Sequence, residues 1–214
     1  MSFLFEGNLT TILDLLGTFA FAVSGMRLAS GKNIDWFGAY VIGLVTAIGG
    51  GTTRDILLDL TPFWMQDVRY LLITGVALLA IILFRDRLFR LGKTLFLFDA
   101  IGLGFFTVTG ISKSLEAGFP IWVCIIMGTI TGCIGGVIRD IIINEVPLLF
   151  RKDLYAIACI VGGVVYFIGF QFQAAFPFHT LAAALTVIAT RIIAVRFHLQ
   201  LPIFDSLKSD NDLS

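Results

Sequence analysis

Long apolar runs separated by short polar segments make up most of the chain. Seven of these runs have lengths near the roughly 20 residues with which a helix crosses a bilayer. They cover approximately Leu9–Met26, Trp36–Leu58, Val68–Phe84, Thr94–Ile111, Pro120–Ile143, Leu154–Phe170 and Phe178–Val195. The pattern predicts an all-α integral membrane protein with seven transmembrane helices. They form a single transmembrane domain over about residues 1–200, followed by a polar tail at 201–214.

Composition supports a membrane location. Hydrophobic residues make up 57% of the chain and charged residues only 14%, compared with roughly 25% charged residues in a soluble domain. The mean hydropathy is +0.95. Residues 1–9 contain Glu6 but no Lys or Arg, unlike the basic start of a cleaved signal peptide, so we expect the first apolar run to be retained.

Basic residues are concentrated in alternate loops. They follow the first, third, fifth and seventh apolar runs, at Arg27, Lys32, Arg85, Arg87, Arg90, Lys93, Arg151, Lys152, Arg196 and Lys208. Loops rich in Lys and Arg stay in the cytoplasm. We therefore expect a multi-pass protein of the cell inner membrane, with its N-terminus outside and its C-terminal tail in the cytoplasm.

One motif occurs twice at a fixed distance. The pattern Gly-Gly-x-x-Arg-Asp-Ile begins at Gly50 and again at Gly135, an offset of 85 residues. The same offset relates further identical residues without a gap, at Asp14/Asp99, Gly17/Gly102, Phe21/Phe106, Val23/Val108, Gly25/Gly110, Gly43/Gly128, Thr46/Thr131, Pro62/Pro147 and Tyr70/Tyr155.

The offset predicts an internal duplication of three helices. The first repeat covers about residues 7–84 and the second about 92–170, and a seventh helix at about 178–197 lies outside both. Because three is odd, the second repeat must enter the membrane in the opposite sense. Two inverted repeats related by a pseudo-two-fold axis in the membrane plane are typical of transport proteins.

The repeated glycines have two interpretations. Gly49, Gly50 and Gly51, matched in part by Gly135 and Gly136, weaken a helix in mid-span and would expose carbonyl oxygens to a cation pathway. Small residues also recur at every fourth position of the second and fifth runs, which is typical of close helix contact. These stripes are Ala39, Gly43, Ala47, Gly51 and Cys124, Gly128, Gly132, Gly136.

Hydroxyl side chains near these glycines are further candidates for the pathway. Thr46/Thr131 and Ser24/Thr109 occupy matched positions in the two repeats. Their oxygens are suited to replacing part of the water shell of a monovalent cation. The alternative is that each hydroxyl bonds to a carbonyl of its own helix.

Charged residues inside the apolar runs are candidates for function or for pairing, because an isolated charge is costly in a membrane. The motif places Arg54 next to Asp55, and Arg139 next to Asp140. Counting residues from the span ends places Asp14 level with Arg54, and Asp99 level with Arg139, within a few Å. We therefore expect either an Asp–Arg clamp within each repeat or direct contact of these charges with an ion.

Other polar residues give weaker signals. Lys113, at the outer end of the fourth run, is either a voltage-sensitive obstruction or a solvated loop lysine. Cys124, Cys133 and Cys159 fit as small apolar fillers, and the two histidines have no metal-site spacing. Catalytic and phosphate-binding motifs are missing, so we expect no enzyme, no cofactor and no metal site. Nothing indicates a nucleic-acid partner.

The doubled motif, the two three-helix repeats and the extra seventh helix resemble the prokaryotic branch of the TRIC family, the trimeric intracellular cation channels. The resemblance covers about residues 7–197. It implies a homotrimer in the lipid membrane, with one potassium-permeable pore in each protomer framed by broken second and fifth helices. The family motif falls on Gly49, Gly50, Gly51, Arg54, Asp55, Gly135, Gly136, Arg139 and Asp140.

Two positions depart from the family pattern. The second motif has Ile134 where the first has Gly49, and the Lys-Glu-Val signature of the animal branch is replaced by Asn144-Glu145-Val146. Lipid or calcium regulation of animal members is therefore not carried over. A secondary transporter of a small solute such as glycine or another amino acid remains the rival hypothesis, since inverted repeats also serve carriers. A purely structural membrane subunit is a third.

Overall fold

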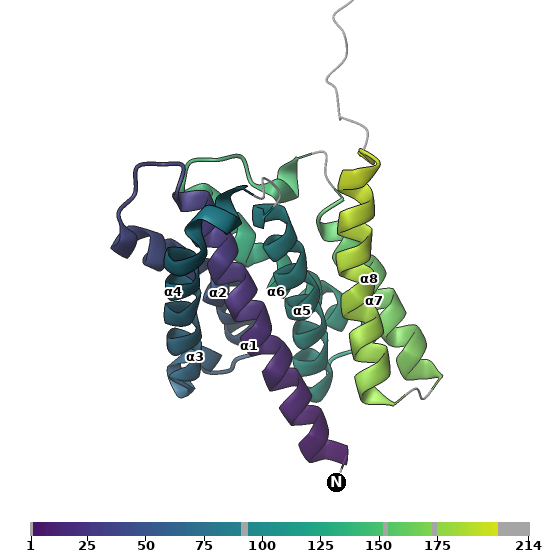
Figure 1. Cartoon of the computed structure of the whole chain (residues 1–214). Coiled ribbons are helices and arrows are strands. Elements are labelled where there is room, and N and C mark those ends of the chain that lie inside the picture. The colour runs from purple at the N-terminus through teal and green to yellow at the C-terminus, as the bar shows by residue number, and fades with distance from the viewer. Residues whose placement is uncertain (1, 91–93, 152–153, 173–174, 201–214) are drawn as a thin grey trace, which may run out of the picture.

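The computed structural model describes residues 2–90, 94–151, 154–172 and 175–200, which form a bundle of helices (Figure 1). Its helices are α1 (Ser2–Ala29), α2 (Trp36–Leu57), α3 (Phe63–Gln66), α4 (Arg69–Arg90), α5 (Thr94–Glu116), α6 (Ile121–Ile142), the 3-10 helix η1 (Leu148–Phe150), α7 (Ala156–Gln171) and α8 (Phe176–Arg196). The all-α prediction is confirmed. The polar tail at 201–214 and the start of the second repeat at 92 lie outside the described residues.

Each of the seven predicted runs contains one long helix, while the short α3 and η1 were not predicted. Within the described residues, four helices are long and apolar enough to cross a membrane, namely α1 from Leu9 on, α5, α6 and α8. α7 is also strongly apolar but has only 16 residues. α4 continues past the predicted end of its run, with non-helical dihedral angles at Phe84 (φ −106°, ψ 17°). The count of seven membrane spans stays a prediction.

α1 and α5 lie at the centre of the bundle. α1 packs on α2, α4 and α5, α5 packs on α6 and α8, and α2 packs on α6. α7 and α8 form a pair beside this group (Figure 1). The rings of Phe21 and Phe106, which occupy matched positions of the two repeats, meet at 5.1 Å between α1 and α5. The two repeats therefore share one core.

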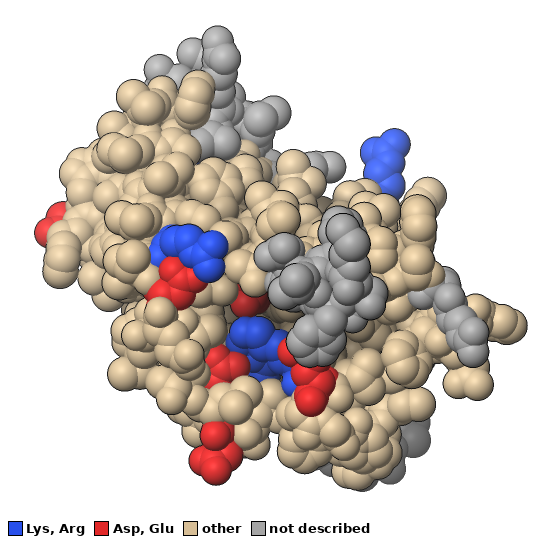
Figure 2. All heavy atoms as spheres, turned by 90° about the horizontal axis from the view of Figure 1, so that it is seen from below, with Lys and Arg blue, Asp and Glu red and all other residues tan. Residues whose placement is uncertain are grey.

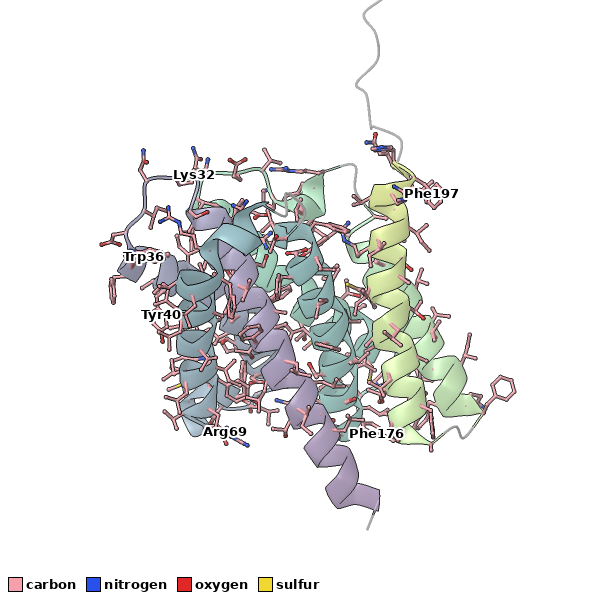
Figure 3. The ribbon with its side chains drawn as sticks, in the orientation of Figure 1. Lys32, Trp36, Tyr40, Arg69, Phe176 and Phe197 are labelled. Atoms are coloured by element: carbon pink, nitrogen blue, oxygen red, sulfur yellow. The ribbon has the colours of Figure 1, made fainter. Side chains whose placement is uncertain are left out.

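The bundle has two ends, which we name after a basic residue at each. Lys32 and Phe197 lie at one end, here called the Lys32 end, and Arg69 and Phe176 lie at the other, the Arg69 end (Figure 3).

Asp59 and Asn144, which are 85 residues apart and follow α2 and α6, both have φ of 57°. Asp and Asn tolerate this left-handed conformation better than most residues.

Candidate functional site

α2 and α6 cross in close backbone contact at the repeated glycines. A Cβ atom on Gly50 would overlap the carbonyl oxygen of Thr131, and a Cβ atom on Gly135 would overlap the carbonyl oxygen of Thr46. The two contacts are reciprocal under the 85-residue offset. No side chain fits between the helices at these two positions, so the crossing is closed in this structure.

The predicted helix breaks are wrong. α2 runs without interruption through Gly49–Gly51, and α6 runs without interruption through Gly135–Gly136. The packing explains this, because the contact with a neighbouring helix offsets the roughly 1 kcal/mol by which each glycine weakens a helix relative to Ala. Close helix contact, the alternative that the small-residue spacing allowed, is what the structure has.

Three of the four predicted cation-binding hydroxyls, those of Thr46, Thr131 and Thr109, bond to their own helices. Thr46 and Thr131 each donate to the carbonyl oxygen four residues earlier, both at 2.6 Å. Thr109 donates to the carbonyl oxygen of Phe106 at 3.3 Å. Each donated hydrogen is thus used locally, although a hydroxyl oxygen keeps acceptor capacity.

Arg139 is the centre of the second-repeat cluster, which we define as Asp99, Arg139 and Asp140. Its Nη1 lies 2.6 Å from Asp99 Oδ1, and its Nε donates to Asp140 Oδ1 at 2.8 Å. Nη1 also donates to Ser24 Oγ at 2.7 Å, and the Tyr155 hydroxyl donates to Asp99 Oδ1 at 3.4 Å. The predicted Asp99–Arg139 clamp is confirmed, and Ser24 belongs to it.

The first-repeat cluster, Asp14, Arg54 and Asp55, is arranged differently. Arg54 Nε donates to Asp55 Oδ1 at 2.8 Å, but Arg54 forms no ion pair with Asp14 within 4.0 Å. Asp14 Oδ2 instead accepts from the Tyr70 hydroxyl at 3.3 Å and lies 3.5 Å from Lys113 Nζ. The predicted Asp14–Arg54 clamp is therefore wrong, because the carboxylate faces a cation from the other repeat.

Asp55 and Asp140 use their second oxygens identically. Asp55 Oδ2 accepts from the backbone N–H of Phe63 at 2.8 Å, and Asp140 Oδ2 accepts from that of Leu148 at 3.0 Å. Phe63 and Leu148 are again 85 residues apart and begin α3 and η1. Each motif aspartate thus joins its arginine to the segment that follows the helix.

Lys113 and Arg54 lie near one aromatic ring. The Phe63 ring centroid is 5.4 Å from Lys113 Nζ and 5.6 Å from Arg54 Cζ. Gly51 permits this approach, since a Cβ atom there would overlap the Phe63 ring. The side chain of Lys113 is 25% exposed, so it is neither fully buried nor a freely solvated loop lysine. Its predicted voltage sensitivity stays a prediction.

A cavity of about 740 Å³ opens at the Arg69 end and reaches Asp55 of the first-repeat cluster. Asp55, Phe63, Tyr70 and Lys113 are among its lining residues. Figure 2, which views this end, shows basic side chains inside a hollow and acidic side chains around it. In all, the lining holds the four carboxylates and two cations Asp55, Asp59, Asp67, Glu116, Arg69 and Lys113.

A smaller cavity of about 200 Å³ lies at the Lys32 end. Arg139 and Asp140 line it together with Glu145 and Arg151. An exposed ion pair at this cavity joins the two repeats, with Lys32 Nζ 2.7 Å from Glu145 Oε1. The hydrogen bond from Lys32 lowers the pKa of Glu145 below its ordinary value. The cavity at the Arg69 end therefore reaches the first-repeat cluster at Asp55 of α2. The cavity at the Lys32 end reaches the second-repeat cluster at Arg139 and Asp140 of α6.

Known proteins share both the sequence and the fold. A family model described as "Glycine transporter" matches residues 11–86 and again 96–171, so the two matches also lie 85 residues apart. The inner membrane protein YadS of Escherichia coli K12 is 41% identical over 198 residues, which cover 90% of this chain and 94% of that protein. A membrane protein of Vibrio cholerae is 39% identical, covering 93% and 84%.

Solved structures decide the family. A structure concerned with conductance through TRIC cation channels has a TM-score of 0.82 and 34% identity, covering 93% of this chain and 98% of its own. The trimeric intracellular cation channel orthologue of Rhodobacter sphaeroides has a TM-score of 0.83 and 32% identity, covering 89% and 99%. This chain belongs to the TRIC family. Its relatives are membrane proteins, as the composition predicted.

Three residues beside the two clusters of this TRIC protein were absent from the predicted site. Tyr70 and Tyr155 each contact the cluster aspartate of their own repeat. Their match at the 85-residue offset was a signal that could have found them. Arg191, buried in α8 and stacked over the Tyr155 ring at 4.8 Å, had no such signal, since it lies outside the repeat.

Proposed function

We propose that this TRIC protein is a channel for monovalent cations that is permeable to potassium. The route runs within one protomer, from the 740 Å³ cavity at the Arg69 end, past the crossing of α2 and α6, to the 200 Å³ cavity at the Lys32 end. The observation that carries the proposal is the similarity over nearly the whole chain to TRIC cation channels. Both cavities also end on buried charges of the two crossing helices.

Cation preference follows from the charges at the Arg69 end. The cavity there is lined by more carboxylates than cations, and a cleft lined by one sign of charge concentrates the opposite ion. Farther in, each motif arginine, Arg54 and Arg139, is paired with a carboxylate. An entering potassium ion therefore meets no uncompensated positive group from the paired motif residues.

The crossing of α2 and α6 is the closed point of this route. Gly50 and Gly135 hold the two backbones in contact, so potassium passes only when the helices separate there. A route that closes by backbone contact has no dedicated carbonyl filter of the kind that selects potassium in other channels. We expect weak preference for potassium over sodium and exclusion of anions.

Orientation and assembly are further parts of the proposal. Arg27, Lys32, Arg85 and Arg151 belong to segments at the Lys32 end, and the positive-inside rule therefore favours a cytoplasmic location for that end. The matched contacts at opposite ends support two inverted repeats, with α8 added, and thus seven membrane-spanning helices. A homotrimer is supported by the Rhodobacter sphaeroides relative, which is described as trimeric.

A carrier for glycine is the second candidate, and the description of the matching family model favours it. A carrier with a substrate site at the repeat interface needs room for the solute there. The backbone contacts at Gly50 and Gly135 leave no such room at the crossing in this structure. The same contacts also close the route to potassium, so the channel is preferred because nearly the whole chain is similar to solved TRIC cation channels.

Purified protein in a planar bilayer separates the two functions. A channel gives unitary potassium current steps whose reversal potential follows the potassium gradient when chloride is varied. A glycine carrier gives no unitary steps and instead exchanges labelled glycine across proteoliposomes. Glycine counterflow without potassium steps would overturn the proposal.

A further inference from the structure

The two motif clusters need one additional cation each. Each consists of two carboxylates and one arginine, so each carries one net negative charge when all three groups are ionised. Lys113 supplies the missing charge to the first-repeat cluster, at 3.5 Å from Asp14. The position that matches Lys113 in the other repeat is Leu28. The second-repeat cluster therefore receives no cation from the duplication.

Arg191 of α8 lies beside this second cluster. Its side chain is buried, with 1% of the residue exposed, and its Cζ lies 4.8 Å from the ring centroid of Tyr155 and 5.4 Å from that of Phe96. The hydroxyl of the same Tyr155 donates to Asp99. Arg191 and Asp99 are each five residues from the Lys32 end of their helices, which places them at similar depth.

The bonding of Arg191 is incomplete. Its Nε and Nη1 are buried and donate to no partner among the described residues, and it forms no ion pair within 4.0 Å with any described carboxylate. A buried cation is costly in a membrane protein unless opposite charge lies near. The uncompensated negative charge of the second-repeat cluster, reached through Tyr155, is the nearest such charge that the contacts identify.

We propose that Arg191 is the counterpart of Lys113 at the other end of the route. It cancels the net negative charge of the second-repeat cluster, and its stacking holds Tyr155 against Asp99. Arg191 is thus a positioning residue that sets how readily cations enter from the Lys32 end. The helix outside the repeat would thereby replace a charge that the duplication lacks. This inference rests on the proposed channel function.

Neutralising Arg191 tests the inference. Arg191→Met replaces the charged side chain with an apolar one of similar length. The surroundings of the cluster then carry one positive charge less. In symmetric dilute KCl, potassium current entering from the Lys32 end should rise about twofold relative to the opposite current, as one charge about 10 Å away in water predicts. The difference should vanish in 1 M KCl, where the screening length falls to about 3 Å. A C-terminal tag reports which way each channel faces.

Two further variants separate charge from packing. Arg191→Lys keeps the charge and should conduct like the wild type. Leu28→Lys places a cation in the cavity that Arg139 and Asp140 line, at the position that matches Lys113, and should restore symmetric current to Arg191→Met. A merely structural role for Arg191 would not be rescued by a lysine on α1.

The outcomes are distinguishable from failure of the proposed function. Wild-type protein that passes no potassium current would overturn the channel itself. Wild-type channels that conduct, with Arg191→Met giving the same current ratio in dilute KCl, would overturn only the role of Arg191. If Arg191→Met does not reconstitute, the Leu28→Lys variant with Arg191 intact tests the inference by itself. It should lower current from the Lys32 end about twofold in dilute KCl, and an unchanged ratio would contradict the inference.

Discussion

The first-repeat and second-repeat clusters contain the same three residue types at the same spacing but form different contacts. Arg139 binds both Asp99 and Asp140 and also Ser24. Arg54 binds only Asp55 of its own cluster, while Asp14 faces Lys113. The second cluster is a clamp between helices of one repeat. In the first cluster, Asp14 pairs with a lysine from the other repeat and not with Arg54.

This difference shows which contacts a sequence duplication preserves. Contacts within one helix and its following turn are kept, as for Asp55 with Phe63 and Asp140 with Leu148. Contacts between helices depend on neighbours that the duplication does not copy, such as Lys113. We therefore expect the second cluster to contribute more to stability and the first to conduction.

Removing the two arginines should give the largest difference between the clusters. Arg139→Ala leaves Asp99 and Asp140 buried without their shared partner, which should cost about 3–5 kcal/mol. Arg54→Ala should cost less, because Asp14 keeps its contacts with Lys113 and Tyr70. Thermal unfolding in detergent measures both. Equal losses would contradict the contrast.

The glycine crossing should respond equally in both repeats. Gly50→Ala and Gly135→Ala each push a methyl group against a carbonyl oxygen of the facing helix, and such overpacking costs about 1–3 kcal/mol. Gly75→Ala is the matched control, since a Cβ atom there meets nothing within 4 Å and should stabilise α4 by about 0.5–1 kcal/mol. The same unfolding assay checks all three. A neutral Gly50→Ala would mean that α2 and α6 are not held in contact.

Lys113→Met should change conduction more than stability. Removing the ammonium group leaves buried Asp14 with the Tyr70 hydroxyl as its remaining side-chain partner and removes a charge from the membrane field. If Lys113 moves through part of that field, open probability should become less voltage-dependent, by up to about 2.3 kcal/mol per 100 mV for a full crossing. Single-channel recording measures this. Unchanged voltage dependence would mean that Lys113 does not move in the membrane field and only pairs with Asp14.

The exposed pair at the Lys32 end should give the smallest effect. Lys32 lowers the pKa of Glu145 below the ordinary 4.5, so the pair contributes fully above that value and is lost as pH falls through the lowered one. Hydrogen-exchange protection of residues 30–35, meaning the intrinsic rate at each pH divided by the observed rate, should therefore fall at acid pH in the wild type. In Glu145→Gln this protection should be low at every pH. An exchange rate in the variant that still depends on this transition would exclude Glu145 as its source.

Hydrophobic pattern was enough to predict the helices but not their contacts. Each apolar run became a helix because burial and backbone bonding both require it in a membrane. The glycine breaks were predicted wrongly, because helix weakness is local whereas the packing that offsets it comes from the facing helix. Lys113 was missed as the partner of Asp14 because depth was compared only within one repeat. Arg191 lies outside the repeat and could be found only from the structure.

The route between α2 and α6 can be tested at Ile138, whose side chain lies against Gly49 at the crossing. Ile138→Cys is made in a protein whose Cys124, Cys133 and Cys159 are replaced by Ala, with Ile141→Cys, 61% exposed, as the matched control on α6. A positively charged thiol reagent applied while channels open should abolish potassium current through Ile138→Cys and spare Ile141→Cys. Full current through channels labelled at Ile138, with labelling verified by mass, would place the pathway elsewhere.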